Sequence, residues 1–485
     1  MSYCSIAGAI GLAITLSVST STLFASNKEE VIETYGDKLN KNRIANKIRL
    51  SENEGEISKI ANQAAKVSSK VDQAGNRKIY GNEFNPSIGI ILNGKYSAYS
   101  QSDSEIKGFG IGHEGERGSE GLAMDHSELN FSASIDDKFT GSLTAAIASH
   151  GGSDHVELEE AYIKTSPGFN LPVGLSIKAG RAFWTLGYLN EHHAHADDFA
   201  DRPLPYRAFL NKAFNDDGIE ASFIFPTQLY FEIGGGAFRG ADFPGGNSSN
   251  EHHAHHEEDD HHEEDAHHEE DDHHEEDAHH EENDHTEEGA SAYSLFARIG
   301  GDIGMNQTWR IGGYWLSSNV RGRESNEHNI SFYGSSDLYV ADFRYTWAPT
   351  GNARNKELII QGEVFFRSEQ GTYNDEGGNA YDVAFDDSAS GWYAQSVYKF
   401  HQQWRVGYRY TALRSPGTPT GLIGTDLDSE GYNPYIHSIM ADWTNSEFSR
   451  IRLQYNNDKT AKGQTDNQLI LQYTMSIGAH GAHKY

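Results

Sequence analysis

The chain has 485 residues and a formal net charge of −32, of which −20 lies in the single run 251–288. The other residues carry only −12 and hold no cluster of Lys and Arg that would bind a phosphate backbone, which excludes nucleic acid as a partner. The one cysteine, Cys4, leaves no disulfide and no thiol nucleophile for the rest of the chain.

The first 78 residues predict a leader followed by a helical segment. An apolar stretch over 6–18, followed by Leu23-Phe24-Ala25-Ser26, is typical of a secretory signal peptide over 1–25 with cleavage near Ala25. Residues 27–78 are polar and helix-prone, with apolar positions at spacings of three and four, the a and d pattern of a coiled coil. These positions are Ile57, Ile60, Ala64, Val67 and Val71. The pattern is compatible with a short periplasmic coiled coil, which would make the protein a homotrimer or a dimer, and with a single amphipathic helix.

Beyond this segment the apolar period becomes two, which predicts β-strands. Trp404, Val406 and Tyr408 share one face of such a strand, whereas Arg405 and Arg409 share the other. Sixteen strands are predicted, near 86–99, 125–135, 138–148, 156–166, 174–184, 216–225, 228–238, 291–301, 306–319, 336–347, 356–368, 390–400, 402–413, 434–445, 447–456 and 467–478.

The connections between these strands favour a membrane barrel over a soluble sandwich. Short turns such as Asp136–Asp137 alternate with long loops such as 185–215 and 239–290, and the strand count is even. We therefore expect an all-β fold, a transmembrane antiparallel β-barrel of about 16 strands over 84–485. Its apolar face would meet outer-membrane lipid, and its polar face would line a lumen. Closure leaves no unpaired sheet edge in the lipid.

The acidic run 251–288 predicts a disordered outer loop that binds metal. From His255 to Asp284 it forms a near-regular hexad, His-His-Glu-Glu-Asp-x, repeated five times, and no apolar side chain is larger than alanine. Imidazole and carboxylate together suit zinc, and also copper or nickel, as bound divalent ions. A solvated acidic spacer is the alternative. The predicted ligands are His252, His253, His255, His256, His261, His262, His267, His268, His273, His274, His279, His280 and His285.

A second metal site is predicted in the third outer loop, within GYLNEHHAHADDFADRPLPYRAFL, residues 187–210. In an extended segment His193 and His195 project to the same side and can share one ion. Glu191, Asp198 or Asp201 would complete three or four ligands. The alternative is a polar loop whose Asp and His side chains hold its own backbone in turns.

A basic strip is predicted on the lumen side of the later strands. It would oppose the acidic loops and set a transverse field across the pore, while the acidic mouth favours cations over anions. The arginines leave an anion-preferring or general porin open as an alternative, with the metal-buffering loop incidental. The predicted pore-lining residues are Arg310, Arg405, Arg409, Arg450 and Arg452.

The chain resembles Gram-negative porins in ending with an aromatic residue, Tyr485. Counted in steps of two, Tyr485 falls in register with the apolar face of the last predicted strand. The helical N-terminal segment with 16 strands resembles the phosphate-selective porin group. Loop 187–210 resembles a family of His-rich, zinc-linked outer-membrane proteins sometimes labelled TonB-dependent receptors. These resemblances imply a channel in the Gram-negative outer membrane, with zinc as a ligand and not a catalytic cofactor.

Two further classes of function fit the same sequence less well. A TonB-dependent metal receptor would need a folded plug domain before a barrel of about 22 strands, and the stretch ahead of the first strand is too short for one. An enzyme is not expected, because no G-x-S-x-G or H-E-x-x-H motif is present.

Overall fold

The computed structural model describes residues 86–478 except 103, 151–152, 167–168, 242, 247–288, 326–329, 379 and 447. The signal peptide, the helical segment 27–78, the His-rich run 251–288 and Tyr485 lie outside the described residues and stay predictions. Within the described ranges, no helix is long and apolar enough to cross a membrane.

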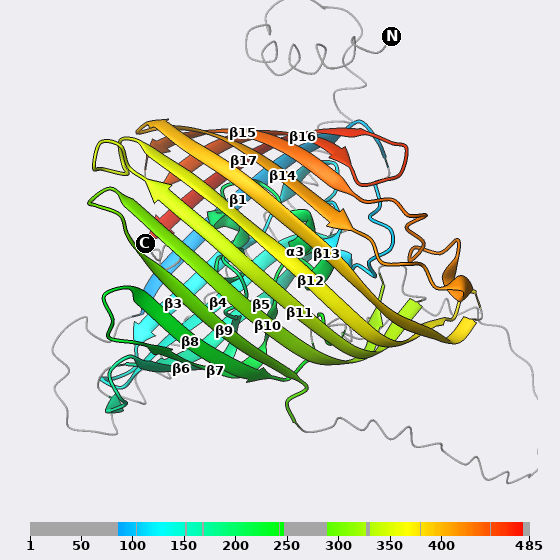
Figure 1. The fold of residues 1–485 in the computed structure, drawn as a ribbon. Coiled ribbons are helices and arrows are strands. Elements are labelled where there is room, and N and C mark those ends of the chain that lie inside the picture. The colour runs from blue at the N-terminus through cyan, green and yellow to red at the C-terminus, as the bar shows by residue number, and fades with distance from the viewer. Residues whose placement is uncertain are drawn as a thin grey trace, which may run out of the picture. The chain divides into compact units, whose positions relative to one another are not determined.

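The described strands form one closed antiparallel sheet, shown in Figure 1. The strands are β1 (Ser87–Tyr99), β2 (Gly121–Met124), β3 (Ser127–Ser134), β4 (Phe139–His150), β5 (Ser153–Thr165), β6 (Leu175–Phe183), β7 (Asn215–Ile224), β8 (Tyr230–Phe238), β9 (Ala292–Asp302), β10 (Gln307–Glu324), β11 (Ile330–Trp347), β12 (Glu357–Asp375), β13 (Ala380–His401), β14 (Trp404–Arg414), β15 (Tyr435–Ser446), β16 (Ser449–Lys459) and β17 (Asp466–Gly478). The helices are α3 (Leu204–Leu210) and the 3₁₀ turns η1 (His113–Gly115), η3 (Leu189–Glu191), η4 (Ala194–Ala196) and η5 (Thr420–Leu422).

The barrel closes between the first and last strands, where β1 pairs with β17 from Gly89↔Gly478 to Tyr99↔Gln468. Both β2 and β3 pair with β1, at different heights, and so share one place in the ring. The seventeen labelled strands therefore make a barrel of sixteen, as predicted, and each predicted strand overlaps an observed one. The strands β10 to β13 extend further than predicted. Strand β4 extends to His150 and strand β5 begins at Ser153, so both are also longer than predicted at this end.

The two faces of the wall have opposite character. On β14, Trp404, Val406 and Tyr408 are 42–47% exposed on the outside, whereas Arg409 and Thr411 are buried inside. Other strands repeat this alternation, so large apolar side chains cover the outer wall and polar ones face the interior. The outer wall is therefore suited to lipid.

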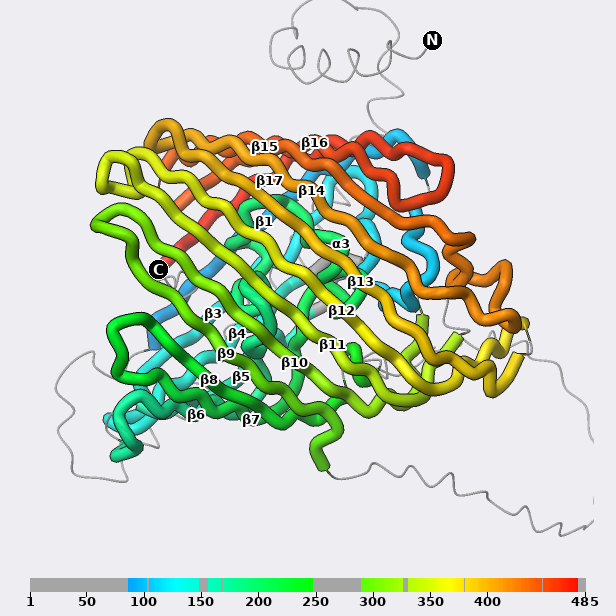
Figure 2. The backbone as a smooth tube through the Cα atoms, viewed as in Figure 1, coloured from blue at the N-terminus to red at the C-terminus, as the bar shows by residue number. Residues whose placement is uncertain are grey.

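The two rims of the barrel also differ (Figure 2). One rim carries short turns, such as the two-residue connection between β13 and β14. The other rim carries the long connections, including 100–120, 184–214 and 415–434. Outer-membrane barrels have their short turns on the periplasmic side, which assigns the long connections to the outside of the cell.

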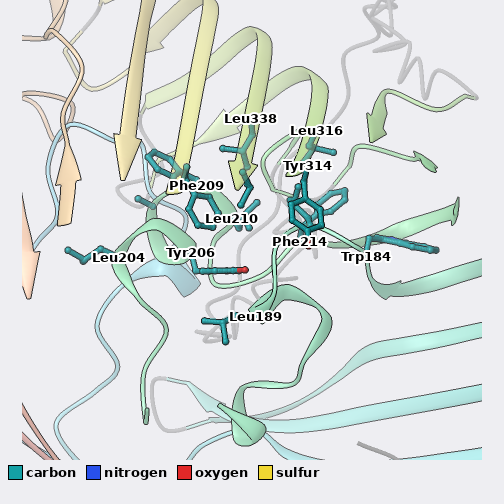
Figure 3. Packing of buried hydrophobic residues seen from close by; sticks show 14 of the residues in the cluster. Trp184, Leu189, Leu204, Tyr206, Phe209, Leu210, Phe214, Tyr314, Leu316 and Leu338 are labelled. Atoms are coloured by element: carbon teal, nitrogen blue, oxygen red, sulfur yellow. The ribbon is translucent and has the colours of Figure 1, made fainter. Parts of the chain in front are cut away.

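The interior is occupied by residues 184–214, which leave β6, turn into the barrel and return to β7; we call this segment the inward loop. All seven residues of α3 are buried, and its side chains pack on Phe365, Tyr393 and Leu413 of the wall. Figure 3 shows Phe209 and Leu210 of α3 near Leu338 of the wall, and Tyr206 and Leu316 belong to the same buried cluster. Proline in the first turn of α3 and a left-handed Asn211 at its end define this short helix.

Candidate functional site: the inward loop and the wall around it

A buried asparagine closes the neck of the inward loop. The Asn190 amide donates to the carbonyl oxygens of Trp184 (2.8 Å) and Phe214 (2.9 Å), and its oxygen accepts the Phe214 N–H at 2.6 Å. Arg202 then cross-links the interior of the loop by donating to the carbonyls of Leu189 and His192. The loop is therefore a compact structure with its own polar framework.

Charged side chains of the barrel wall hold the far side of the loop. Arg405 on β14 pairs with Asp198 at 2.7 Å, and Arg409 pairs with Asp201. On another part of the wall, Arg298 of β9 pairs with Glu191. These carboxylates, which the sequence suggested as metal ligands, thus lie at three separate ion pairs with arginine.

The remaining predicted pore-lining arginines also face the interior. Arg450 and Arg452 donate to the backbone carbonyls of His195 (2.6 Å) and Asp197 (2.8 Å). Arg310 pairs with Asp342 at 2.9 Å. The basic strip therefore exists on the inner wall, and its members bind the inward loop or wall carboxylates.

A buried carboxylate fixes the first turn of the loop. Glu363 on β12 accepts the backbone N–H groups of Tyr188 (3.1 Å) and Leu189 (3.2 Å) and the hydroxyl of Tyr206 (2.9 Å). Next to it, Gly187 has φ +79°, and an added Cβ would lie 2.2 Å from a Glu363 oxygen. Only glycine fits this close approach of the backbone to the wall.

Two of the three histidines of the loop, His193 and His195, meet glutamates of the wall. His193 Nδ1 lies 3.1 Å from Glu159 Oε2, and His193 Nε2 lies 3.0 Å from Glu160 Oε2. His195 Nδ1 lies 2.6 Å from Glu128 Oε1, and the two imidazole rings stack at 5.7 Å. The wall ends of this cluster come from β3 and β5.

A β-bulge places two consecutive glutamates on the same side of β5. Thr144 of β4 pairs with Glu160, but the next residue, Ala145, pairs with Leu158, so Glu159 is the extra residue. A bulge of this kind interrupts the alternation of side chains between the two faces. Glu159 and Glu160 consequently both reach His193.

The structure thus brings together only part of the set predicted from the sequence. His193 and His195 lie together, while Glu191, Asp198 and Asp201 are held elsewhere by arginines. The sequence reasoning missed the wall residues of the cluster. These are His126, Glu128, Glu159 and Glu160. Metal binding by the predicted residues stays a prediction.

Burial and neighbouring charges set the protonation of the loop. Burial lowers the pKa of His193, but the charge of Glu128 and hydrogen bonds with all three glutamates outweigh it, so its pKa is raised well above the ordinary value. Burial lowers the pKa of His192 to about 4, which keeps that ring neutral. Burial raises the pKa of Asp197 to about 6 in spite of Arg202.

A cavity of about 810 Å³ lies under the inward loop, at the end of the barrel with short turns. The loop contributes Tyr188, Glu191 and His193 to its lining. The wall contributes Glu128, Asn130, Glu160, Lys164, Arg310 and Arg344, among others. The guanidinium groups of Arg310 and Arg344 lie 4.7 and 4.4 Å from the centre of the Tyr188 ring. The cavity is therefore polar, with charges of both signs.

Comparison with known proteins gives the following likenesses. No family model matches the chain. A protein of Aquifex aeolicus (strain VF5), described as an uncharacterized protein, is 26% identical over 418 residues, covering 83% of this chain and 80% of that protein. The anion-selective porin from Comamonas acidovorans shares 8% identity, covers 81% of this chain and 100% of its own, and has a TM-score of 0.46. The trimer form of OmpT from Vibrio cholerae shares 9% identity, with 82% of this chain and 100% of that chain covered and a TM-score of 0.45. The outer membrane channel DcaP of Acinetobacter baumannii shares 10% identity, with 81% of this chain and 97% of that chain covered and a TM-score of 0.44.

The class of protein follows from the barrel itself. A closed antiparallel barrel with an apolar outer wall and a polar interior is the form of Gram-negative outer-membrane proteins. The protein is an outer-membrane β-barrel surrounded by lipid.

Proposed function

We propose that the protein is an outer-membrane channel for small solutes and that the inward loop controls passage through it. The observation that carries the proposal is the polar interior: a closed wall surrounds a loop held by ion pairs, above a polar cavity of about 810 Å³. In a hydrated lumen, the charged side chains that hold the loop can exchange their ion-pair partners for water or for a passing solute.

We further propose that divalent metal ions, zinc above all, are the solutes that the channel captures and passes. Four of the five predicted pore-lining arginines form ion pairs, with Asp198, Asp201, Asp342 or Asp442, so carboxylates offset their positive charge. The outer run 251–288 adds −20 charges and thirteen histidines, which would concentrate cations at the mouth. An anion-preferring porin would need the arginine strip without this acidic mouth.

Single-channel recording on the purified full-length chain in planar lipid bilayers tests the proposal. We expect stepwise currents in metal-free buffer and, under a salt gradient, a reversal potential of the sign that cations produce. A bilayer that receives detergent buffer alone is the control. Silence under all voltages would contradict the channel and favour a surface metal buffer. A reversal potential of the opposite sign would replace the cation channel by an anion porin.

A variant lacking 251–288 tests the metal part of the proposal. Because this run is proposed to collect ions and not to form the pore, its removal should leave conductance nearly unchanged and reduce growth and zinc uptake only when zinc is scarce. A run of the same length with every His replaced by Gln is the matched control for charge alone. Equal growth of all three strains under zinc chelation would contradict zinc capture by this run.

A further inference from the structure

Beneath the inward loop, three side chains from three elements direct metal-binding atoms toward one point. Glu128 of β3, Glu159 of β5 and His193 of the loop each offer one ligand atom, and these atoms lie within 4.8 Å of one another. We infer that these three residues form a binding site for a divalent transition-metal ion, such as zinc, that fastens the inward loop to the barrel wall. The effect on conductance rests on the proposed channel function, whereas binding of the ion does not.

The first argument is that two carboxylates converge on a single ring nitrogen. His193 Nδ1 lies 3.1 Å from Glu159 Oε2 and 3.3 Å from Glu128 Oε2. An imidazole carries one N–H at that nitrogen and directs it well to only one acceptor. A tetrahedral zinc ion with ligands at about 2.0–2.2 Å holds its donor atoms about 3.3–3.6 Å apart. One ion at this point therefore satisfies both carboxylates.

The second argument is that each proposed ligand has an outer partner on its other polar atom. A histidine bound to metal commonly donates its second N–H to a carboxylate, which fixes the ring, and ligating carboxylates are held in the same way. The outer contacts are hydrogen bonds for two of the ligands, His193 Nε2 to Glu160 Oε2 (3.0 Å) and Glu128 Oε1 to His195 Nδ1 (2.6 Å). For the third, Glu159 Oε1 lies 3.4 Å from His126 Nδ1, a longer contact between the two groups. The cluster thus has the layered order of a metal site.

The third argument concerns charge and access. The ion replaces the Nδ1 proton of His193, which leaves to solvent, and its double positive charge balances the two ligating carboxylates. Glu128 and His193 also line the cavity of about 810 Å³, so an ion can approach from that side. A water molecule from the cavity would complete four ligands. Imidazole with carboxylates selects zinc and related divalent ions over calcium or magnesium, which prefer oxygen alone.

The position of the site determines its effect on the channel. His193 belongs to the inward loop, whereas Glu128 and Glu159 belong to the wall, so a bound ion cross-links the two. Because the ion binds the seated loop and not a displaced one, it shifts the population toward the seated form. Metal at this site should therefore decrease conductance.

Zinc binding to the detergent-solubilised chain tests the site directly. The variant lacking 251–288 is the background, so that its histidines do not contribute, and the full-length chain is measured beside it. We expect one tight zinc ion in this background and tetrahedral absorption when cobalt replaces zinc. Glu128→Gln and Glu159→Gln should each weaken binding by about 100-fold or more, and Glu160→Gln by about 10–100-fold.

One further substitution shows whether binding belongs to these three residues. Glu357→Gln, which affects only a wall pair with Lys399 at the turn end of β12, is the matched control and should bind as the parent does. Loss of binding in Glu357→Gln, or unchanged binding in both Glu128→Gln and Glu159→Gln, would overturn the inference. Gel electrophoresis checks that each variant is folded, because an intact β-barrel migrates differently before and after heating.

Current recordings test the effect on the loop. Zinc should reduce the current of the parent, a chelator should restore it, and the current of Glu128→Gln should not respond. If zinc reduces the current of Glu128→Gln and Glu159→Gln as strongly as that of the parent, the cross-link is wrong. If zinc binds as expected but the parent never conducts, the channel proposal fails and the binding site stands.

Discussion

Single buried residues determine where the inward loop sits. Glu363 accepts hydrogen bonds from two backbone amides and a tyrosine hydroxyl of the loop, and from the wall hydroxyl of Tyr393 at 2.6 Å. A buried acceptor with this many donors is costly to remove, because each donor would remain in the interior without a partner. The loop is therefore positioned by a few specific contacts and not only by its apolar helix.

Replacement of Gly187 by alanine should displace the loop. The new Cβ would lie 2.2 Å from a Glu363 oxygen and 2.7 Å from the Tyr206 hydroxyl, on a backbone with φ +79°. We expect a loss of about 1–3 kcal/mol from backbone strain and broken contacts, together with faster trypsin cleavage within the loop. Gly351→Ala is the matched control, because Gly351 has φ +72° but nothing within 4 Å of its added Cβ. Equal stability and equal cleavage in the two variants would contradict this positioning.

The candidate site shows what alternation can and cannot predict at the level of residues. His193 and His195 were predicted as a pair from their spacing, but Glu159 and Glu160 were not named, because a regular strand places consecutive side chains on opposite faces. The sequence does contain a signal for the bulge. Apolar residues occupy Val156 and Leu158, then Ala161 and Ile163, so the apolar parity changes across the two glutamates. The sequence could not identify Glu128 as part of the site. Its contact with His195, which is 67 residues further along the chain, depends on how the inward loop folds.

At the scale of elements, the strands were predictable because their wall has two different environments. Each strand alternates between lipid-facing and interior positions, so the period of two is present in the sequence itself. The longer extents of β10 to β13 were not predicted, because there the inner face carries buried apolar residues such as Val320, Phe332 and Tyr373. The contrast between an apolar outer face and a polar inner face is therefore lost in these parts of the strands. The pairing of the inward loop with the wall was also not predictable, as ion pairs between distant segments leave no periodic pattern.

The ion pairs between the inward loop and β14 should be strongly coupled. A double-mutant cycle of Asp198→Asn and Arg405→Gln should give a coupling energy of about 1–3 kcal/mol in the free energy of unfolding, since the pair is largely buried. The same cycle for Lys462 and Glu430, which are more than half exposed, should give less than about 0.5 kcal/mol. Urea unfolding in detergent measures both. Similar coupling energies for the two pairs would mean that the lumen screens charge as well as the outer surface does.

At the scale of the whole molecule, the described residues form the barrel and its inward loop. The predictions for the barrel wall can be compared with the structure, whereas those for 27–78 and 251–288 cannot. The closed wall and its apolar exterior follow from strands that the sequence predicted. The segment 27–78 and the run 251–288 lie outside the described residues. Trimer formation through 27–78 and metal capture by 251–288 therefore stay predictions, which experiments can test.

Removal of 27–78 tests the contribution of this segment to assembly. If a three-stranded coiled coil joins the chains, the parent should migrate as a trimer without heating, and the shortened chain as a heat-modifiable monomer with the same β-dominated circular dichroism. Replacing Ile60 and Val67 by Asp in the full-length chain is a second variant that keeps the length. A trimer in both variants would assign association to the barrel wall instead.

The contacts of the inward loop also have a consequence for the order in which the protein assembles. Asp198 and Arg405 are 207 residues apart in the chain, and His195 and Arg450 are 255 apart. Contacts of such high contact order form late, because the intervening chain must first be confined. The loop cannot complete its bonds until β14 and β16 have joined the sheet. We therefore expect the wall to be nearly complete before the loop is seated, so that the lumen is filled last.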